Sequence, residues 1–109
     1  MVSFEHFAQL DIRVGKIIAA EEHTLARKPM YRLTVSLGPE LGERTIIAGI
    51  KDRYAREELV GKKIVCVTNL DPKMIAGLES HGMILAAEGD GVLSVIVPDR
   101  DLPEGSQVR

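Results

Sequence analysis

The segment that decides the fold is MYRLTVSL, residues 30–37. Its larger apolar side chains occupy every second position: Tyr31, Leu33, Val35 and Leu37. The residues between them are polar or charged. A period of two places alternate side chains on opposite faces of a β-strand, so this pattern predicts a strand with one buried face.

We expect a further strand on each side of this segment. Residues Leu10–Ala20 carry a similar alternation, which Gly15 interrupts, and we expect the long strand to bend or bulge at that glycine. After the segment, Gly38–Pro39 and Gly42 bracket a predicted turn, and Arg44–Ala48 is the next predicted strand.

The second half of the chain adds a short helix and further strands. Residues Asp52–Gly61 form a charged segment that ends at a glycine, which is typical of a short helix. Strands are predicted at Lys63–Thr68, Met83–Ala87 and Val92–Val97. The Asp90–Gly91 pair before the last of them is a strong hairpin signal.

This order of strands and helix predicts an OB-fold, a small five-stranded barrel that commonly binds oligonucleotides or oligosaccharides. The chain is therefore expected to be all-β with small helices, and its length predicts a single domain over residues 1–109. Outside the barrel we expect a short N-terminal helix, capped by Ser3, that buries Phe4 and Phe7. A C-terminal extension is expected at Leu102–Val108. Because both terminal segments need a surface to pack on, we expect a homodimer.

The composition excludes several classes of protein. A hydrophobic content of 45% and a charged content of 28% are ordinary for a folded soluble protein, so disorder is not expected. The net charge of −2 argues against nonspecific coating of nucleic acid, which relies on a large basic excess. No apolar stretch approaches the roughly 20 residues of a membrane span, and the first residues lack the pattern of a signal peptide. We therefore expect a cytoplasmic protein.

No arrangement of residues indicates an enzyme or a cofactor. The histidines are far apart and lack metal-ligand spacing: His6, His23 and His81. The single cysteine, Cys66, lies in an apolar run that is typical of a buried, inert thiol. Asp99 and Asp101 are typical of a solvated loop rather than of a paired-carboxylate site. We expect no catalytic residue, no metal and no cofactor.

Basic residues are concentrated in two segments of the chain. Residues 27–32 contain three basic residues and no acid, and residues 51–73 contain six basic residues against four acids. Such segregation predicts a basic end that could meet nucleic acid. Aromatic residues, on which bases could stack, are few: Phe4, Phe7, Tyr31 and Tyr54. The expected ligand is therefore a structured RNA recognised by its backbone and shape.

Four stretches of the chain together resemble one known family: LDIRVGKI at 10–17, AGI at 48–50, EELVGKKIVCVTNLDPKMIAGLESHGM at 57–83 and ILAAEGDG at 84–91. They resemble the tRNA-binding domain found at the C-terminus of methionyl-tRNA synthetases, in EMAP II-like cytokine precursors and as free-standing dimers. The resemblance covers nearly the whole chain. It implies a homodimer that binds tRNA and assists an aminoacyl-tRNA synthetase, such as methionyl-tRNA synthetase, in trans.

The same resemblance implies a set of tRNA-binding residues: Lys28, Asn69, Lys73, Ser80, Gly82 and Met83. The last three match the S-x-G-M motif of the family, which is implicated in docking the tRNA surface. In physical terms, Ser80 could exchange a hydrogen bond with a phosphate or a 2′-hydroxyl, Gly82 allows close approach of the backbone, and Met83 offers an adaptable apolar contact. The alternative for this stretch is a turn followed by a core methionine.

One departure from the family supports a second function. The sequence ARKP at 26–29 replaces the usual ADKLY and resembles CsaA, an export-related chaperone with the same fold. CsaA-type sequences differ from this chain at 46–50 and 80–85, so the chain mixes both patterns. The alternative function is therefore a CsaA-like chaperone whose dimer groove holds unfolded preproteins.

Overall fold

In the computed structural model, which describes residues 1–109, the deciding segment forms strand β2, Tyr31–Ser36. This strand pairs in antiparallel register with β1, Ile12–Glu22, on one side and with β3, Glu43–Ala48, on the other. Its burial alternates as predicted, with Leu33 and Val35 completely shielded from solvent.

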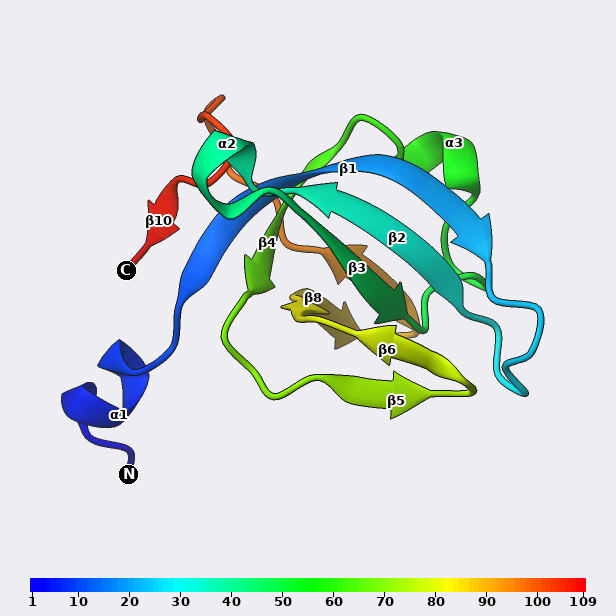
Figure 1. Cartoon of the computed structure of the whole chain (residues 1–109), viewed down its shortest axis with the longest axis horizontal. Helices are drawn as coiled ribbons and strands as arrows, with labels where there is room; N and C mark the ends of the chain where they lie inside the picture. Colours follow the sequence, from blue (N-terminus) through cyan, green and yellow to red (C-terminus); the bar gives the residue numbers. More distant parts are fainter.

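The remaining strands nearly close the sheet into a barrel (Figure 1). Strand β1 also pairs with β4, Lys63–Val67, which in turn pairs with β7, Met83–Ile84, so the strand order is β3-β2-β1-β4-β7. The two ends of this order meet where the backbone N–H of His81 donates to the carbonyl oxygen of Thr45, at 2.8 Å. Helix α3, Arg56–Leu59, lies between β3 and β4 in the sequence, and the predicted five-stranded OB-fold is confirmed.

Aliphatic side chains from every barrel strand fill the interior. The largest fully buried ones include Ile17, Leu33, Ile46 and Ile64, joined by Leu59 from α3. The Cys66 thiol belongs to the same core, and its burial raises its pKa to about 11. It therefore stays a neutral thiol at physiological pH, which confirms the expected role as a small buried hydrophobe.

The irregularity in the long first strand lies at a different residue from the one expected. The pairing of β1 with β2 shifts between Ile17 and Ala19, so the bulge is at Ile18 and not at Gly15. A Cβ on Gly15 would come within 2.6 Å of Val35 Cγ1. That glycine is thus needed for the close approach of the Val35 side chain on the neighbouring strand β2.

The structure contains a hairpin that the sequence analysis did not predict. Strands β5, Lys73–Ile75, and β6, Leu78–Ser80, pair in antiparallel register across the turn Ala76–Gly77. Both turn residues have positive φ, 49° and 87°, as a two-residue hairpin turn requires. This hairpin lies along the open side of β3 (Figure 1).

Further strand predictions also need adjustment. The expected strand 83–87 is divided by Leu85 into β7 and β8, Ala86–Gly89, and β8 pairs with β9, Val92–Val95, in the predicted hairpin. The turn expected at 38–42 is one turn of helix α2, Gly38–Leu41. The C-terminal strand β10, Gln107–Val108, pairs with the start of β1.

The N-terminal helix projects from the barrel (Figure 1). Helix α1, Phe4–Ala8, is capped as predicted by Ser3, whose hydroxyl oxygen accepts from the His6 backbone N–H. The expected burial of its phenylalanines is wrong, because Phe4 is 76% exposed and Phe7 is 42% exposed. Their rings contact each other at a centroid distance of 6.4 Å but meet no surface of the same chain that buries them.

None of the helices has the length and apolar character that a membrane span requires.

Candidate nucleic-acid interface

Four of the six predicted tRNA-binding residues line one hollow beside the β5–β6 hairpin: Lys73, Ser80, Gly82 and Met83. The hollow has a volume of about 250 Å³, and its other walls are Ile47, Leu70, Asp71 and Ile75. These residues come from β3, from the loop after β4, from both strands of the hairpin and from the start of β7. Chain folding therefore brings residues 70–73 and 80–83, which lie within the family-like stretch, to one place.

Ser80 has an internal role in this arrangement. Its side chain is buried, with the residue only 4% exposed. Its hydroxyl oxygen accepts from the backbone N–H of Ile47 at 2.9 Å, and the hydroxyl donates to the carbonyl of Gly82 at 3.3 Å. Ser80 thus supplies the partner that an amide on the free edge of β3 needs, and it fastens the hairpin to the barrel.

Gly82 and Met83 connect the hairpin to β7. Gly82 has φ of +139°, and a Cβ there would come within 2.9 Å of the Val67 carbonyl oxygen, so the position requires glycine. Met83 pairs with Val67 at the start of β7 but is 48% exposed and does not belong to the core. The alternative of a core methionine is therefore wrong, and part of its side chain lies on the surface.

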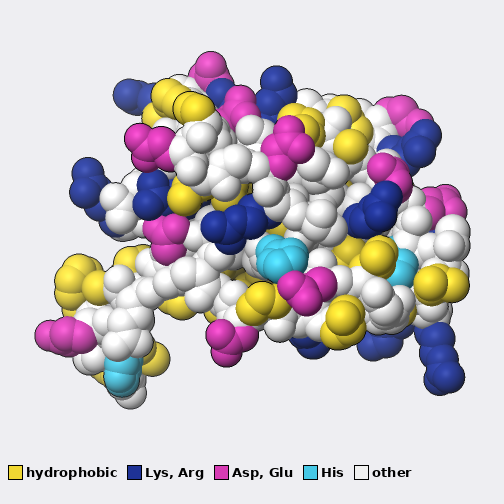
Figure 2. All heavy atoms as spheres, in the orientation of Figure 1, with side chains coloured by type: hydrophobic (Ala, Val, Ile, Leu, Met, Phe, Trp, Pro, Cys, Tyr) yellow, Lys and Arg dark blue, Asp and Glu magenta, His cyan; other side chains and the backbone are white.

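Lys28 lies in a neighbouring hollow formed by the β1–β2 loop. This second hollow, of about 350 Å³, is lined by Lys28 together with Arg27, Met30 and the buried His23. His23 Nε2–H donates to the carbonyl oxygen of Ile75 at 2.8 Å and so ties the loop to the β5–β6 hairpin. Figure 2 shows hydrophobic side chains over the hairpin and the adjacent loop, with acidic, histidine and basic side chains among them.

Only some of the basic residues predicted to form a basic end are free to meet a ligand. Several are held in ion pairs on the surface: Arg32–Glu21, Lys51–Glu22, Arg53–Glu88 and Lys63–Asp101. Arg27, Lys28 and Lys73 are exposed and have no carboxylate partner. Arg56 on α3 and Lys62 beside β4 also have no carboxylate partner. Unpaired positive charge is therefore available at the β1–β2 loop and the hairpin, although it is not confined to them.

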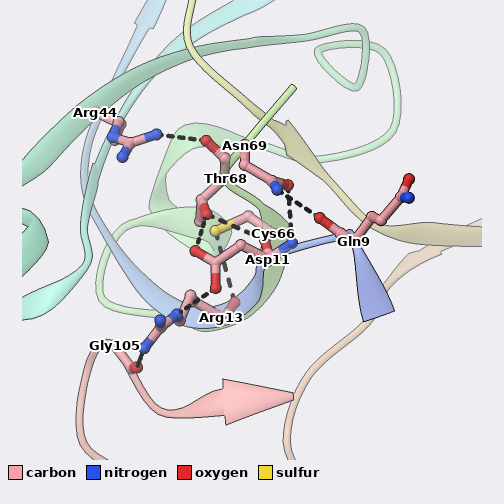
Figure 3. Close-up of polar contacts among 8 residues, drawn as sticks. All are labelled: Gln9, Asp11, Arg13, Arg44, Cys66, Thr68, Asn69 and Gly105. Carbon is pink, nitrogen blue, oxygen red and sulfur yellow. Dashed lines mark hydrogen bonds and ion pairs between the residues drawn. The ribbon is translucent and has the colours of Figure 1, made fainter. Parts of the chain in front are cut away.

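The remaining predicted residue, Asn69, joins the loop between β4 and β5 to the N-terminal arm, residues 1–11 (Figure 3). Its Oδ1 accepts from the Asp11 backbone N–H at 2.8 Å, and its Nδ2 donates to the Gln9 carbonyl at 2.7 Å. The neighbouring Thr68 hydroxyl donates to the Asp11 carboxylate, and this hydrogen bond, with the nearby Arg13, holds the pKa of Asp11 below its usual value. The Asn69 amide is therefore engaged within the chain.

Three residues that help to line the two hollows were not predicted from the sequence: His23, Leu70 and Ile75. Leu70 and Ile75 lie in the family-like segment, so their place between matched positions was an available signal. His23 had no local signal, because its partner Ile75 lies 52 residues later.

A larger hollow elsewhere does not make a better site. It has a volume of about 570 Å³ and contains Lys16 and Lys62 beside Lys63, Asp99 and Asp101. Lys63 Nζ donates to the Asp101 carboxylate at 2.7 Å and lowers the pKa of Asp101. Asp101 therefore lacks the raised pKa that a general acid needs. No group of three His, Cys, Asp or Glu side chains is placed to hold a metal ion.

Comparison with known proteins identifies the family. The family described as "Putative tRNA binding domain" matches residues 12–107. The chain belongs to the tRNA-binding domain family. The methionine–tRNA ligase of Methanococcus maripaludis is 44% identical over 108 residues, which are 99% of this chain and 16% of the ligase. The match therefore spans about a sixth of that ligase, its tRNA-binding domain, and does not reach the catalytic part.

Two solved structures are similar over the whole chain. The chaperone CsaA from Bacillus anthracis superposes with a TM-score of 0.92 at 38% identity, covering 100% of this chain and 99% of that one. A MetRS-related protein from Pyrococcus horikoshii superposes with a TM-score of 0.89 at 35% identity, covering 100% and 98%. The resemblance expected from the sequence is confirmed for both groups.

Proposed function

We propose that this tRNA-binding domain holds structured tRNA on the face formed by the β5–β6 hairpin and the β1–β2 loop. The observation that carries the proposal is the convergence of Lys73, Gly82 and Met83 on one hollow, next to a loop with two unpaired basic residues, Arg27 and Lys28. In OB-folds the corresponding faces and loops commonly bind oligonucleotides.

The predicted residues divide into two kinds of role. Lys28 and Lys73 meet phosphates, while Gly82 and Met83 form the surface that approaches the RNA closely. Ser80 and Asn69 act indirectly: their polar groups are used within the chain, and they position the hairpin and the loop that carry the contacts.

Fluorescence anisotropy with labelled tRNA tests this proposal. Because several phosphates are contacted, affinity should fall by about tenfold or more between 50 and 200 mM salt. Lys28→Ala and Lys73→Ala should each weaken binding and reduce the salt slope by about 1. Lys62→Ala, in the other hollow, is the matched control and should change neither quantity. Equal affinity for tRNA and an unstructured RNA of the same length would contradict shape recognition.

We also propose that one such domain, residues 1–109, acts as a homodimer. The exposed Phe4 and Phe7 project from the barrel on α1, and pairing with a second copy would cover them. Light scattering should therefore give twice the 12.0 kDa chain mass, and Phe4→Ser combined with Phe7→Ser should give a folded monomer. A 12.0 kDa species for the unaltered protein at micromolar concentration would contradict the dimer.

The relatives suggest the setting in which tRNA is bound. Because the matched relatives are methionine–tRNA ligases, we propose an aminoacyl-tRNA synthetase as the protein partner and the cytoplasm as the location. Co-elution of the chain with methionyl-tRNA synthetase on size exclusion, in the presence and absence of tRNA, tests the partner. The similar structure CsaA is named a chaperone. An aggregation assay with an unfolded polypeptide substrate tests whether this chain has that alternative function.

A further inference from the structure

We propose that the 250 Å³ hollow at the hairpin holds one unstacked nucleobase of the bound RNA, and that Lys73 meets the phosphate beside it. This inference rests on the proposed function and adds a base-binding site to it. The walls of the hollow are mainly the apolar side chains of Ile47, Leu70, Ile75 and Met83.

The volume of the hollow and its exposed apolar side chains fit a single base. A volume of about 250 Å³ lies just below the range of pockets that take drug-sized ligands, so it suits one flat ring system. Leu70 and Met83 are large apolar residues that remain substantially exposed, at 41% and 48%. Covering them with the face of a base would remove apolar surface from water.

Met83 supplies a specific contact for an aromatic ring. Thioether sulfur makes favourable contacts with aromatic groups, and the flexible side chain adapts to different rings. No aromatic residue lines the hollow, and the two tyrosines are bonded inside the fold, where Tyr31 Oη–H donates to the Tyr54 carbonyl at 2.8 Å. A base would therefore stack on a thioether and aliphatic carbons in place of the usual aromatic platform.

The charged groups orient the ligand. Lys73 is exposed and free of any ion pair, and Asp71, two residues earlier, also lines the hollow. A phosphate is attracted to Lys73 and repelled by Asp71, so the base edge faces Asp71. A carboxylate accepts hydrogen bonds, so Asp71 favours bases with an exocyclic amino group over uracil. The adjacent unpaired Arg27 and Lys28 favour a polyanion over an apolar polypeptide segment.

Methionine methyl groups report directly on this site. The chain has four methionines, so protein labelled with ¹³C at the methionine methyl gives four resolvable probes. With saturating tRNA, the ring current of a stacked base should move the Met83 methyl upfield. The Met74 methyl is the internal control, because Met74 is exposed on β5 but does not line the hollow. Adenosine, cytidine and guanosine monophosphates should shift Met83 in the same direction, and uridine monophosphate should shift it less.

Three outcomes would overturn the base site. The first is tRNA that binds by anisotropy but leaves the Met83 methyl unmoved. The second is an equal shift from ribose 5-phosphate, which carries the same phosphate without a base. The third is a Met83 shift with unfolded polypeptide and none with RNA. If tRNA does not bind at all, the proposed function fails, and the mononucleotide series alone decides the base site.

A matched pair of variants gives an independent test. Met83→Gln keeps the length of the side chain but removes the thioether, and it should weaken tRNA binding by about tenfold. Met74→Gln makes the same change on β5, at a residue that does not line the hollow, and should leave the tRNA affinity unchanged. Melting temperatures should be similar for both, since neither side chain is buried. Equal losses of affinity in the two variants would contradict the site.

Discussion

Ser80→Ala tests whether the serine of the S-H-G-M segment contacts RNA or holds the hairpin. The substitution removes one oxygen and leaves the backbone unchanged. In the folded protein the Ile47 N–H then loses its only acceptor, which lies at 2.9 Å. The Gly82 carbonyl also loses a donor at 3.3 Å. Because Ile47 and Ser80 are both buried, water does not readily replace these partners.

The magnitude follows from the unsatisfied amide. Leaving a buried donor without an acceptor costs about 1–3 kcal/mol of unfolding free energy. For a chain of this length, such a loss lowers the melting temperature by about 4–12 °C. The hydrogen bond from His81 N–H to the Thr45 carbonyl, at 2.8 Å, remains and keeps the hairpin on β3. The tRNA affinity of the folded variant should therefore change by less than about threefold.

Thermal unfolding and anisotropy with labelled tRNA at 20 °C, measured on the same preparation, separate the two roles. Ser94→Ala is the matched control, because Ser94 is exposed and its hydroxyl bonds only to the adjacent Val95 carbonyl. Its unfolding free energy should change by less than about 0.5 kcal/mol. A Ser80→Ala protein with an unchanged melting temperature and clearly weaker tRNA binding would refute the positioning role and restore a direct contact.

Three further predictions concern glycine geometry, the N-terminal arm and the buried thiol. Gly82→Ala should lower the melting temperature, because φ is +139° and the Val67 carbonyl is too close, whereas Gly89→Ala, with nothing within 4 Å, should not. Asn69→Ala removes both hydrogen bonds to the arm, so limited proteolysis should cut residues 1–10 faster, and urea unfolding should show a loss of about 1–2 kcal/mol. The pKa of Cys66 is raised from 9.0 to about 11 in the folded state. The protonated thiol therefore stabilises the folded protein fully below pH 9, and this contribution to the unfolding free energy is lost as the pH rises through 11. Urea unfolding of Cys66→Ala should therefore lose less free energy between pH 9 and pH 11 than unfolding of the unaltered protein; an equal loss would contradict the raised pKa.

The barrel could be predicted from the sequence because its strands carry their own signals. The alternation through β2 is local, and so is the Asp90–Gly91 turn between β8 and β9. Each depends on side chains within a few residues of one another, and the burial of one face follows from the period alone. The six predicted tRNA-binding residues came from the resemblance to the family, and their contact with RNA stays a prediction.

The β5–β6 hairpin lacked such signals. Its strands have three residues each, and its turn is Ala76–Gly77 rather than an Asn-Gly or Asp-Gly pair. Alanine at positive φ is unfavourable in isolation, so the turn is held by the pairing of the strands and by the attachment of β6 to β3. That attachment joins Ser80 to Ile47, 33 residues away.

The sequence by itself determined the order of the barrel strands, the helix between the third and the fourth, and the residues that face the core. Only the tertiary structure decided that Ser80 is buried, that Met83 is half exposed and that Phe4 and Phe7 have no cover within the chain. The physical reason is the range of the interactions. Periodicity is set by neighbouring residues, whereas exposure depends on which distant segment, if any, packs against a side chain once the chain has folded.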